Sequence, residues 1–368
     1  MIPLPPGITS RLIPGINGLT MHVLEAGNPA HKLILLLHGF PELAYSWRKI
    51  MVPLAEAGFH VVAPDQRGYG RTTGWSDDYD GSLVPFRLFN LVRDVLGLVQ
   101  ALGHTEVALL AGHDFGSPVA AWCALLRPDI FRRLTLMSAP FAGPPRIGAA
   151  APKGDVSPER DVHADLAALP RPRKHYQWYY STPEANANMQ HARQGVGTFL
   201  RAYYHHKSAD WPGNTPFKLA GWTAAELAKM PTYYIMDLHE GMAETVAHEM
   251  PAGEAPWLTD AELAVYAAEY ARTGFQGGLQ WYRCGTTGAF TPELELFSGR
   301  TIDIPSCFIA GSSDWGVQQR PGAVEAMNGT ACTDMRFCDL IEGAGHWVQQ
   351  EQPAAVVEKL LGFLKNSS

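Results

Sequence analysis

The chain has 368 residues, of which 46% are hydrophobic, so we expect one large domain or one domain that carries an insertion. A formal net charge of -7 and the lack of any run of lysine and arginine argue against a nucleic-acid partner. No signal-peptide pattern opens the chain and no apolar stretch approaches the roughly 20 residues that span a bilayer, so we expect a cytoplasmic protein without a membrane span.

The first half of the chain predicts a mostly parallel sheet with crossover helices. The dipeptide Asn17-Gly18 predicts the turn between two antiparallel strands. Between the later strands, apolar residues recur at spacings of three or four from Phe89 to Leu102, which predicts an amphipathic helix that ends at Gly103. Short apolar runs without polar alternation predict strands that are buried on both faces, at residues 32–37, 60–65, 106–112 and 133–138.

The composition and the periodicity of the sequence change after about Pro140. Residues 141–173 are rich in proline, alanine and glycine without a clear period, and helical stretches dense in aromatic residues follow. Strand texture returns at 304–311, and a final amphipathic helix starts near Pro353. We therefore expect an α/β fold in which a mostly helical insertion interrupts a sheet that the carboxyl-terminal part completes.

Asp114 occupies a tight turn between a predicted buried strand and a helix with Pro118 in its first turn. Gly112 and Gly116 stand two positions either side of it, and such small residues are needed where the backbone of a strand-to-helix nucleophile elbow passes closely. The central side chain then projects over the carboxyl edge of the sheet, at a helix N-terminus that favours negative charge. The alternative is that this aspartate only caps the helix.

Two later residues favour the catalytic interpretation of Asp114. Asp314 directly follows the predicted strand 304–311, and His346 lies in the loop beyond the last predicted strand. The order nucleophile, acid and histidine, each at the end of its own strand, is typical of the α/β-hydrolase fold. We predict that these three residues form a catalytic triad.

Five motifs agree in order and spacing with one family: HGFPE at 38–42, SWR at 46–48, PDQRGYG at 64–70, GHDFGS at 112–117 and GAGHW at 343–347. On these motifs the chain resembles the epoxide hydrolase branch of the α/β-hydrolase superfamily. The resemblance covers nearly the whole chain except the Pro/Ala-rich part of the insertion. It implies an α/β-hydrolase core domain at 1–140 and 286–368 and a mostly helical cap domain at 141–285. It also implies a small-molecule epoxide substrate and no metal or organic cofactor. The sequence does not determine the oligomeric state, and a monomer or homodimer is expected.

Chemistry assigns roles to the triad. A carboxylate can attack a strained sp3 carbon and form an ester on Asp114, whereas a serine would leave a stable ether. Water activated by His346 can then hydrolyse the ester, while Asp314 orients the imidazole. The backbone N–H groups of Phe40 and Phe115 are expected to form the oxyanion hole. In this family the peptide bond after the first of these phenylalanines is usually cis, so we expect a cis bond here.

Ring opening creates an alkoxide, which needs a proton donor. The resemblance implies two cap tyrosines, and the segments 175–180 and 277–285 match. The Tyr-Gln pattern selects Tyr176 over its neighbours at 179 and 180, and the WYR pattern selects Tyr282; simple packing of the cap is the alternative for both. A largely apolar substrate pocket is expected, with lining residues Gln177, Trp178, Trp281 and Trp347.

Two dehalogenase classes use the same triad. Haloalkane dehalogenases generally carry a tryptophan after the nucleophile to bind halide, where this chain has Phe115, and haloacetate dehalogenases place arginines there, which residues 115–118 lack. A non-catalytic ligand receptor on the same fold is an alternative of another class, and the complete triad argues against it.

His38 and His113 are expected to hold loops by hydrogen bonds. The five cysteines form no Cys-x-x-Cys pair and are expected to be reduced.

Overall fold

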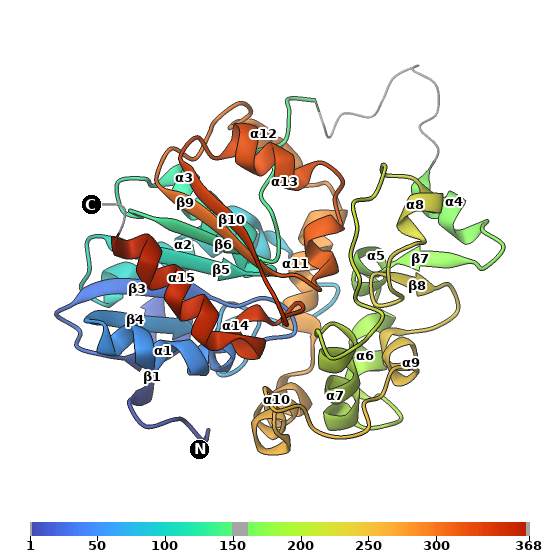
Figure 1. Cartoon of the computed structure of the whole chain (residues 1–368), viewed down its shortest axis with the longest axis horizontal. Coiled ribbons are helices and arrows are strands. Elements are labelled where there is room, and N and C mark those ends of the chain that lie inside the picture. The colour runs from blue at the N-terminus through green and yellow to red at the C-terminus, as the bar shows by residue number, and fades with distance from the viewer. Residues whose placement is uncertain (1, 149–160, 366–368) are drawn as a thin grey trace.

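A central sheet organises the computed structural model, which describes residues 2–148 and 161–365 (Figure 1). In the described part of the chain, the order of its strands is β1-β2-β4-β3-β5-β6-β9-β10. Strand β2 is antiparallel to β1 and β4, and the other neighbouring strands are parallel. The bounds are β1 (Ile8–Ile16), β2 (Leu19–Ala26), β3 (Lys32–Leu37), β4 (Phe59–Pro64), β5 (Val107–His113), β6 (Leu134–Met137), β9 (Ser306–Gly311) and β10 (Met335–Ile341).

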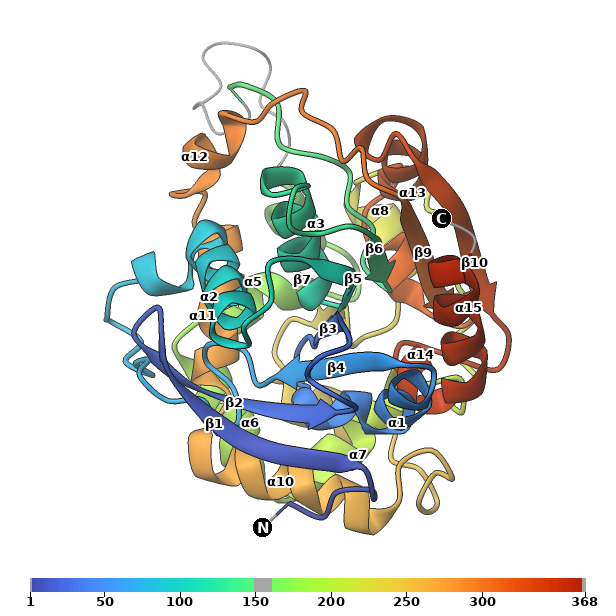
Figure 2. The same cartoon turned by 90° about the vertical axis from the view of Figure 1, so that its left-hand side faces the viewer.

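Helices cover both faces of this sheet, which explains why its central strands are continuous apolar runs. Helix α1 (Arg48–Glu56) packs against α15 (Pro353–Lys365), and α2 (Leu88–Ala101) packs against α3 (Gly116–Leu126). The two pairs lie on opposite faces (Figure 2). Every residue of β3 after Lys32 is buried. Three short helices complete the core: α12 (Thr291–Glu295), α13 (Ala323–Ala326) and α14 (Val348–Glu351).

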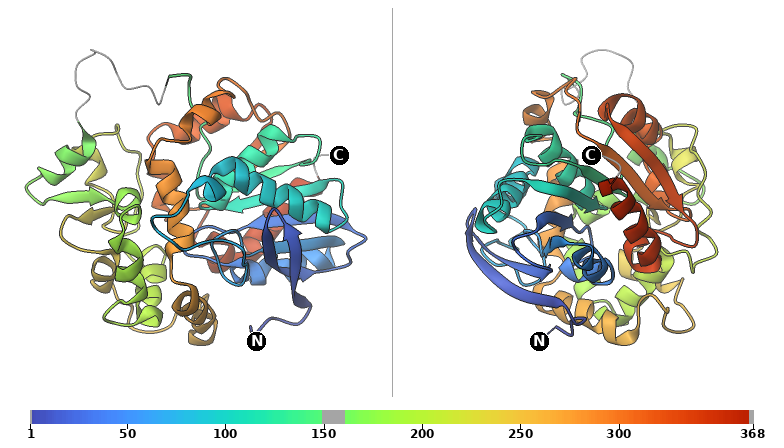
Figure 3. Two further views of the ribbon diagram at one scale, coloured as in Figure 1. Left: turned by 180° about the vertical axis from the view of Figure 1, so that it is seen from behind. Right: turned by 60° about the vertical axis from the view of Figure 1, so that its left-hand side comes forward.

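A mostly helical cap lies between β6 and β9 in the chain and beside one end of the sheet in space (Figures 1 and 3). Its described helices are α4 (Val162–Ala167), α5 (Tyr176–Tyr180), α6 (Glu184–Gln190), α7 (Val196–His206), α8 (Ala224–Leu227), α9 (Met242–Ala247), α10 (Asp260–Thr273) and α11 (Gln276–Thr286). The cap also contains a two-stranded antiparallel sheet, formed by β7 (Arg173–His175) and β8 (Ile235–Asp237). The predicted helical insertion is confirmed, while the limits 141–285 stay a prediction.

Hydrogen bonds fix the cap on the loops that follow the carboxyl ends of the parallel strands. The Tyr204 hydroxyl donates to the carbonyl of Pro41, in the loop after β3, at 2.8 Å. The indole of Trp281 donates to the carbonyl of Arg67, after β4, at 3.0 Å. In parallel sheets this edge is where ligand sites are built.

The predicted elements agree well with the observed ones. The predicted buried strands correspond to β3, β4, β5, β6 and β9, with small differences at their ends. Helix α2 ends before Gly103, whose φ of 78° is in the left-handed region. All five cysteines are free thiols, as predicted. Part of the Pro/Ala-rich stretch, residues 149–160, lies outside the described residues. No described helix is both long and apolar enough to cross a membrane.

Candidate active site

The turn after β5 presents Asp114 at the carboxyl edge of the sheet. Its φ of 51° is left-handed, which is uncommon outside glycine. A Cβ at Gly112 would lie 2.2 Å from the carbonyl oxygen of Gly116, and a Cβ at Gly116 would lie 2.3 Å from that of Leu37. Only glycine fits at either position, so the sequence pattern of the elbow has a direct steric cause.

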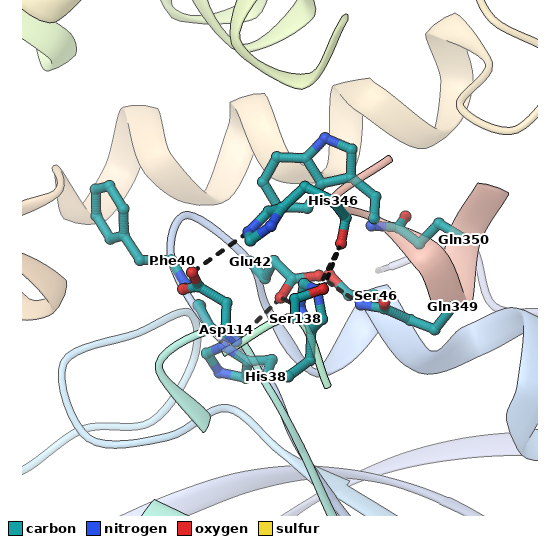
Figure 4. A network of polar contacts seen from close by, with 12 residues as sticks. His38, Phe40, Glu42, Ser46, Asp114, Ser138, His346, Gln349 and Gln350 are labelled. Atoms are coloured by element: carbon teal, nitrogen blue, oxygen red, sulfur yellow. Dashed lines mark hydrogen bonds and ion pairs between the residues drawn. The ribbon is translucent and has the colours of Figure 1, made fainter. Parts of the chain in front are cut away.

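His346 stands between the two predicted carboxylates. Its Nε2 lies 3.3 Å from Asp114 Oδ2, and its Nδ1 lies 3.1 Å from Asp314 Oδ1. The imidazole points at the carboxylate of Asp114 in Figure 4. Asp314 also accepts a 2.7 Å hydrogen bond from the Gly316 N–H, which fixes its carboxylate. The structure therefore brings the three residues of the predicted triad together.

The charges at the triad favour ionised carboxylates. Burial opposes ionisation of Asp114, but the adjacent His346 outweighs it and holds the pKa of Asp114 below its usual value. The pKa of Asp314 is lowered in the same way, against burial, by His346 and by its hydrogen bonds. Asp114 is thus a carboxylate at neutral pH, as a nucleophile must be.

The backbone of His346 is fixed on three sides. Its N–H donates to the carbonyl of Lys207 at 2.9 Å. Its own carbonyl accepts from the Ser138 hydroxyl at 3.2 Å and from His113 Nε2 at 2.7 Å (Figure 4). The other ring nitrogen of His113 lies 2.5 Å from the Glu42 carboxylate. Burial disfavours a charged His113, yet this buried carboxylate outweighs it and raises the pKa of His113.

One backbone donor already faces the nucleophile. The Phe40 N–H donates to Asp114 Oδ1 at 2.9 Å. The Phe40–Pro41 peptide bond is cis, as predicted. Phe115 begins the turn into α3, and its side chain is half-buried beside the cap. One of the two predicted oxyanion-hole donors, the Phe40 N–H, is therefore already hydrogen-bonded to the carboxylate of Asp114.

A cavity of about 470 Å³ opens over Asp114, between core and cap. Its size is in the usual range for small-molecule sites, roughly 300–1,000 Å³. Cys284 is part of its wall, as are residues 141–143 and 145 at the start of the Pro/Ala-rich stretch. Six predicted site residues line it: Asp114, Phe115, Tyr176, Gln177, Trp281 and Tyr282.

The two predicted tyrosines line this cavity side by side, and their rings pack edge-on with centroids 5.9 Å apart. The Tyr176 hydroxyl donates to Gln319 Oε1 at 2.9 Å and accepts from the Gln177 amide at 3.2 Å. The Tyr282 ring packs edge-on against Phe115, and its hydroxyl has no hydrogen-bond partner among the described residues. Burial, reinforced by the charge of Asp114, raises the pKa of both phenols well above the usual value, so both carry a proton at neutral pH.

Two predicted pocket residues are not in the lining of this cavity. Trp178 is 39% exposed and packs on His163 at the cap surface. It follows Tyr176 by two residues, and because consecutive helical residues are about 100° apart, the two side chains point to opposite sides. Trp347 is fully buried behind His346, where its indole donates to a backbone carbonyl. The expectation for these two tryptophans is therefore corrected.

Two polar residues near the site had no signal in the sequence. Gln319 lies in a turn five residues after Asp314 and accepts the hydrogen bond of the Tyr176 hydroxyl, and no motif marks that position. Lys207 is a buried cation next to His346 and lies in a stretch that reads as an ordinary helix end. Within residues 2–148 and 161–365, no three His, Cys, Asp or Glu side chains are grouped as metal ligands.

The parallel sheet, the glycine-framed elbow and the histidine between two aspartates define an α/β-hydrolase. Residues 32–353 match the family model of the alpha/beta hydrolase fold. Epoxide hydrolase A of Mycobacterium tuberculosis is 34% identical over 97% of this chain and 97% of its own length. Epoxide hydrolase B of the same organism is 33% identical over 94% and 96%.

Solved structures agree with these relatives. An epoxide hydrolase from an endophytic Streptomyces superposes with a TM-score of 0.77 at 30% identity, covering 98% of this chain and 96% of that one. Epoxide hydrolase A from Mycobacterium thermoresistibile gives 0.74 at 31% identity, with 98% and 99% covered. The chain belongs to the epoxide hydrolases of the α/β-hydrolase superfamily, which confirms the resemblance predicted from its motifs.

Proposed function

We propose that this chain converts epoxides to vicinal diols through a covalent ester on Asp114. The observation that carries the proposal is a single cavity lined by the nucleophile and by two protonated phenols. Nucleophile and acids from opposite walls are what ring opening of an epoxide requires, because charge develops on the ring oxygen as the carbon–oxygen bond breaks.

The first step forms the ester. Asp114 Oδ1 is held by the Phe40 N–H, so the other carboxylate oxygen, Oδ2, attacks an epoxide carbon. The ring carbon–oxygen bond breaks, its electron pair stays on the epoxide oxygen, and a tyrosine hydroxyl supplies the proton. Tyr282 is the better placed donor because its hydroxyl has no partner among the described residues, whereas Tyr176 must first leave Gln319.

The second step hydrolyses the ester. His346 Nε2 has no hydrogen-bond partner among the described residues and takes a proton from water as that water attacks the ester carbonyl carbon. Asp314 stabilises the resulting imidazolium. The Phe40 and Phe115 N–H groups stabilise the oxyanion, at about 3 kcal/mol for each well-placed donor. Collapse of the intermediate releases the diol alkoxide, which takes the imidazolium proton. The second proton of the water is left on the Asp114 carboxyl and passes to the tyrosine phenolate, which restores both the carboxylate and the phenol.

The cavity wall favours an epoxide over a haloalkane. Phe115 has no side-chain donor for a departing halide. Trp281 does line the cavity, but its indole N–H is bonded to the carbonyl of Arg67 at 3.0 Å and is not free to bind halide. Release of halide from a haloalkane, measured beside epoxide turnover, tests this choice directly.

Intact-protein mass spectrometry of His346→Gln with styrene oxide tests the mechanism. Without the base, the ester should accumulate, and the mass should rise by that of one epoxide. Peptide mapping should place the adduct on Asp114, and the double variant with Asp114→Asn should stay unmodified. An unmodified His346→Gln protein across a broad panel of epoxides would overturn the proposal.

A further inference from the structure

Lys207 is a buried cation at the junction of cap and core. It directly follows α7 and is only 2% exposed. A lysine this deeply buried normally pairs with a carboxylate. Within residues 2–148 and 161–365, however, no carboxylate oxygen lies within 4.0 Å of its ammonium nitrogen. Its ammonium is instead surrounded by aromatic rings.

Four ring centroids lie near Lys207 Nζ: Tyr234 at 4.9 Å, Trp347 at 5.4 Å, Tyr203 at 5.5 Å and Tyr233 at 5.8 Å. Ring faces attract a cation within about 6 Å, so the rings keep the ammonium charged without neutralising it. Its positive charge therefore acts on the neighbouring groups. Burial lowers the pKa of Lys207, and the buried carboxylates Asp114, Asp314 and Glu42 act in the opposite direction.

The cage touches the triad through one covalent neighbour and one hydrogen bond. Trp347, one wall of the cage, follows His346 in the chain, and the carbonyl of Lys207 accepts the His346 N–H at 2.9 Å. Lys207 does not line the substrate cavity. Whatever it contributes to the reaction therefore passes through His346 and the two aspartates, not through contact with substrate.

We propose that Lys207 is a positioning residue of the hydrolytic step, whose caged ammonium sets the pH range in which ester hydrolysis runs. The proposal rests on the proposed function. In the free enzyme two carboxylates flank His346 and oppose the charge of the ammonium. Esterification removes the charge of Asp114 and leaves the ammonium opposed by one triad carboxylate fewer. A positive charge beside the triad disfavours a second one, so base catalysis can begin at a lower pH when Lys207 is present.

Other titratable groups also face His346 and its loop. The His113 ring, paired with Glu42, lies 5.0 Å from the His346 ring. The Glu351 carboxylate accepts the N–H groups of Gly345 and Trp347, either side of His346, and burial raises its pKa to about 7 against these hydrogen bonds. Three cage phenols, at 203, 233 and 234, stay protonated at neutral pH because burial raises their pKa.

The test compares Lys207→Met and Lys207→Arg in single-turnover experiments with an ultraviolet-absorbing epoxide, which separate ester formation from ester hydrolysis. Methionine is a flexible apolar chain that suits an aromatic site. In Lys207→Met, the acidic limb of the plot of ester-hydrolysis rate against pH should move to higher pH by about one unit, so that the rate at low pH falls about tenfold. In Lys207→Arg, the acidic limb should stay where it is in the wild type. Ester formation should keep its wild-type pH dependence, because Asp114 is ionised throughout.

Lys229→Met is the matched control, since it removes a lysine from the cap surface that pairs only with Glu226. The shift should persist when Lys207→Met is made in a Glu351→Gln background, which excludes titration of Glu351 as its source. If Lys207→Met does not fold, Lys207→Gln removes the same charge. An equal loss of both steps at every pH, or an unmoved acidic limb, would overturn the proposal. Failure of the wild type to form any ester would instead overturn the proposed function.

Discussion

Gly39 and Asp114 touch across the site: a Cβ on Gly39 would lie 2.4 Å from Asp114 Oδ1. We expect Gly39→Ala to displace the nucleophile and to lower epoxide turnover by about 10² or more, since a 1 Å misplacement costs about that much. The melting temperature should fall as well, because the new Cβ would also lie 2.4 Å from the Cβ of Asp114, which is fixed to the elbow backbone. Gly221→Ala, where a Cβ meets nothing within 4 Å, is the control. Unchanged turnover in Gly39→Ala would show that Asp114 is not held in this position.

Tyr282→Phe should slow ester formation by about 10² and leave ester hydrolysis nearly unchanged, because the phenol serves only the first step. Stopped-flow single turnovers measure both rates. Tyr180→Phe is a matched control, since the Tyr180 ring packs on Tyr282 at 5.0 Å but its hydroxyl donates to Tyr203. Equal slowing of both steps would contradict the role of Tyr282 as acid.

Glu42→Ala should destabilise the fold by about 3–5 kcal/mol, because it leaves the buried His113 without its carboxylate. Turnover should fall as well, since His113 holds the carbonyl of His346. Chemical denaturation measures the first effect. Glu106→Ala breaks an exposed pair with Arg132 at 3.6 Å and should change stability little. Similar losses from the two variants would show that burial does not strengthen the Glu42 pair.

The contribution of Glu351 to the stability of the wild type should fall as pH rises from about 4.5 to about 7. Its folded pKa is raised above the unfolded value, so the folded state binds more protons in this window and loses stability as they leave. The loss is at most about 3 kcal/mol, at 1.36 kcal/mol per unit of pKa. Chemical denaturation across this pH range should show that the free energy of unfolding loses this falling contribution in Glu351→Gln, so its slope against pH is less negative than in the wild type. Equal slopes would assign the pH dependence to other groups.

The parts of the site that sequence patterns predicted are those with local causes. The elbow glycines are required by close contacts with backbone atoms that are only a few residues along the chain or one strand away. The buried strands are predicted by apolar runs in the sequence. The partner of Tyr176 could not be predicted, because Gln319 reaches it from a turn 143 residues later in the chain. The cage around Lys207 combines residues from three distant segments, and only packing of cap on core brings them together. Trp178 was misplaced because the direction of a side chain on a five-residue helix depends on which face the cap buries.

The wall of the cavity that holds Asp114 also includes Cys284, whose thiol donates to the carbonyl of Leu83 at 3.5 Å. An epoxide is an alkylating agent, and thiolates are stronger nucleophiles toward it than carboxylates. Burial raises the pKa of Cys284 to about 12, so this group stays a neutral thiol at physiological pH. Under the proposed function, this protonation would favour alkylation of Asp114, whose ester the enzyme can cleave, over alkylation of the thiol, whose thioether it could not.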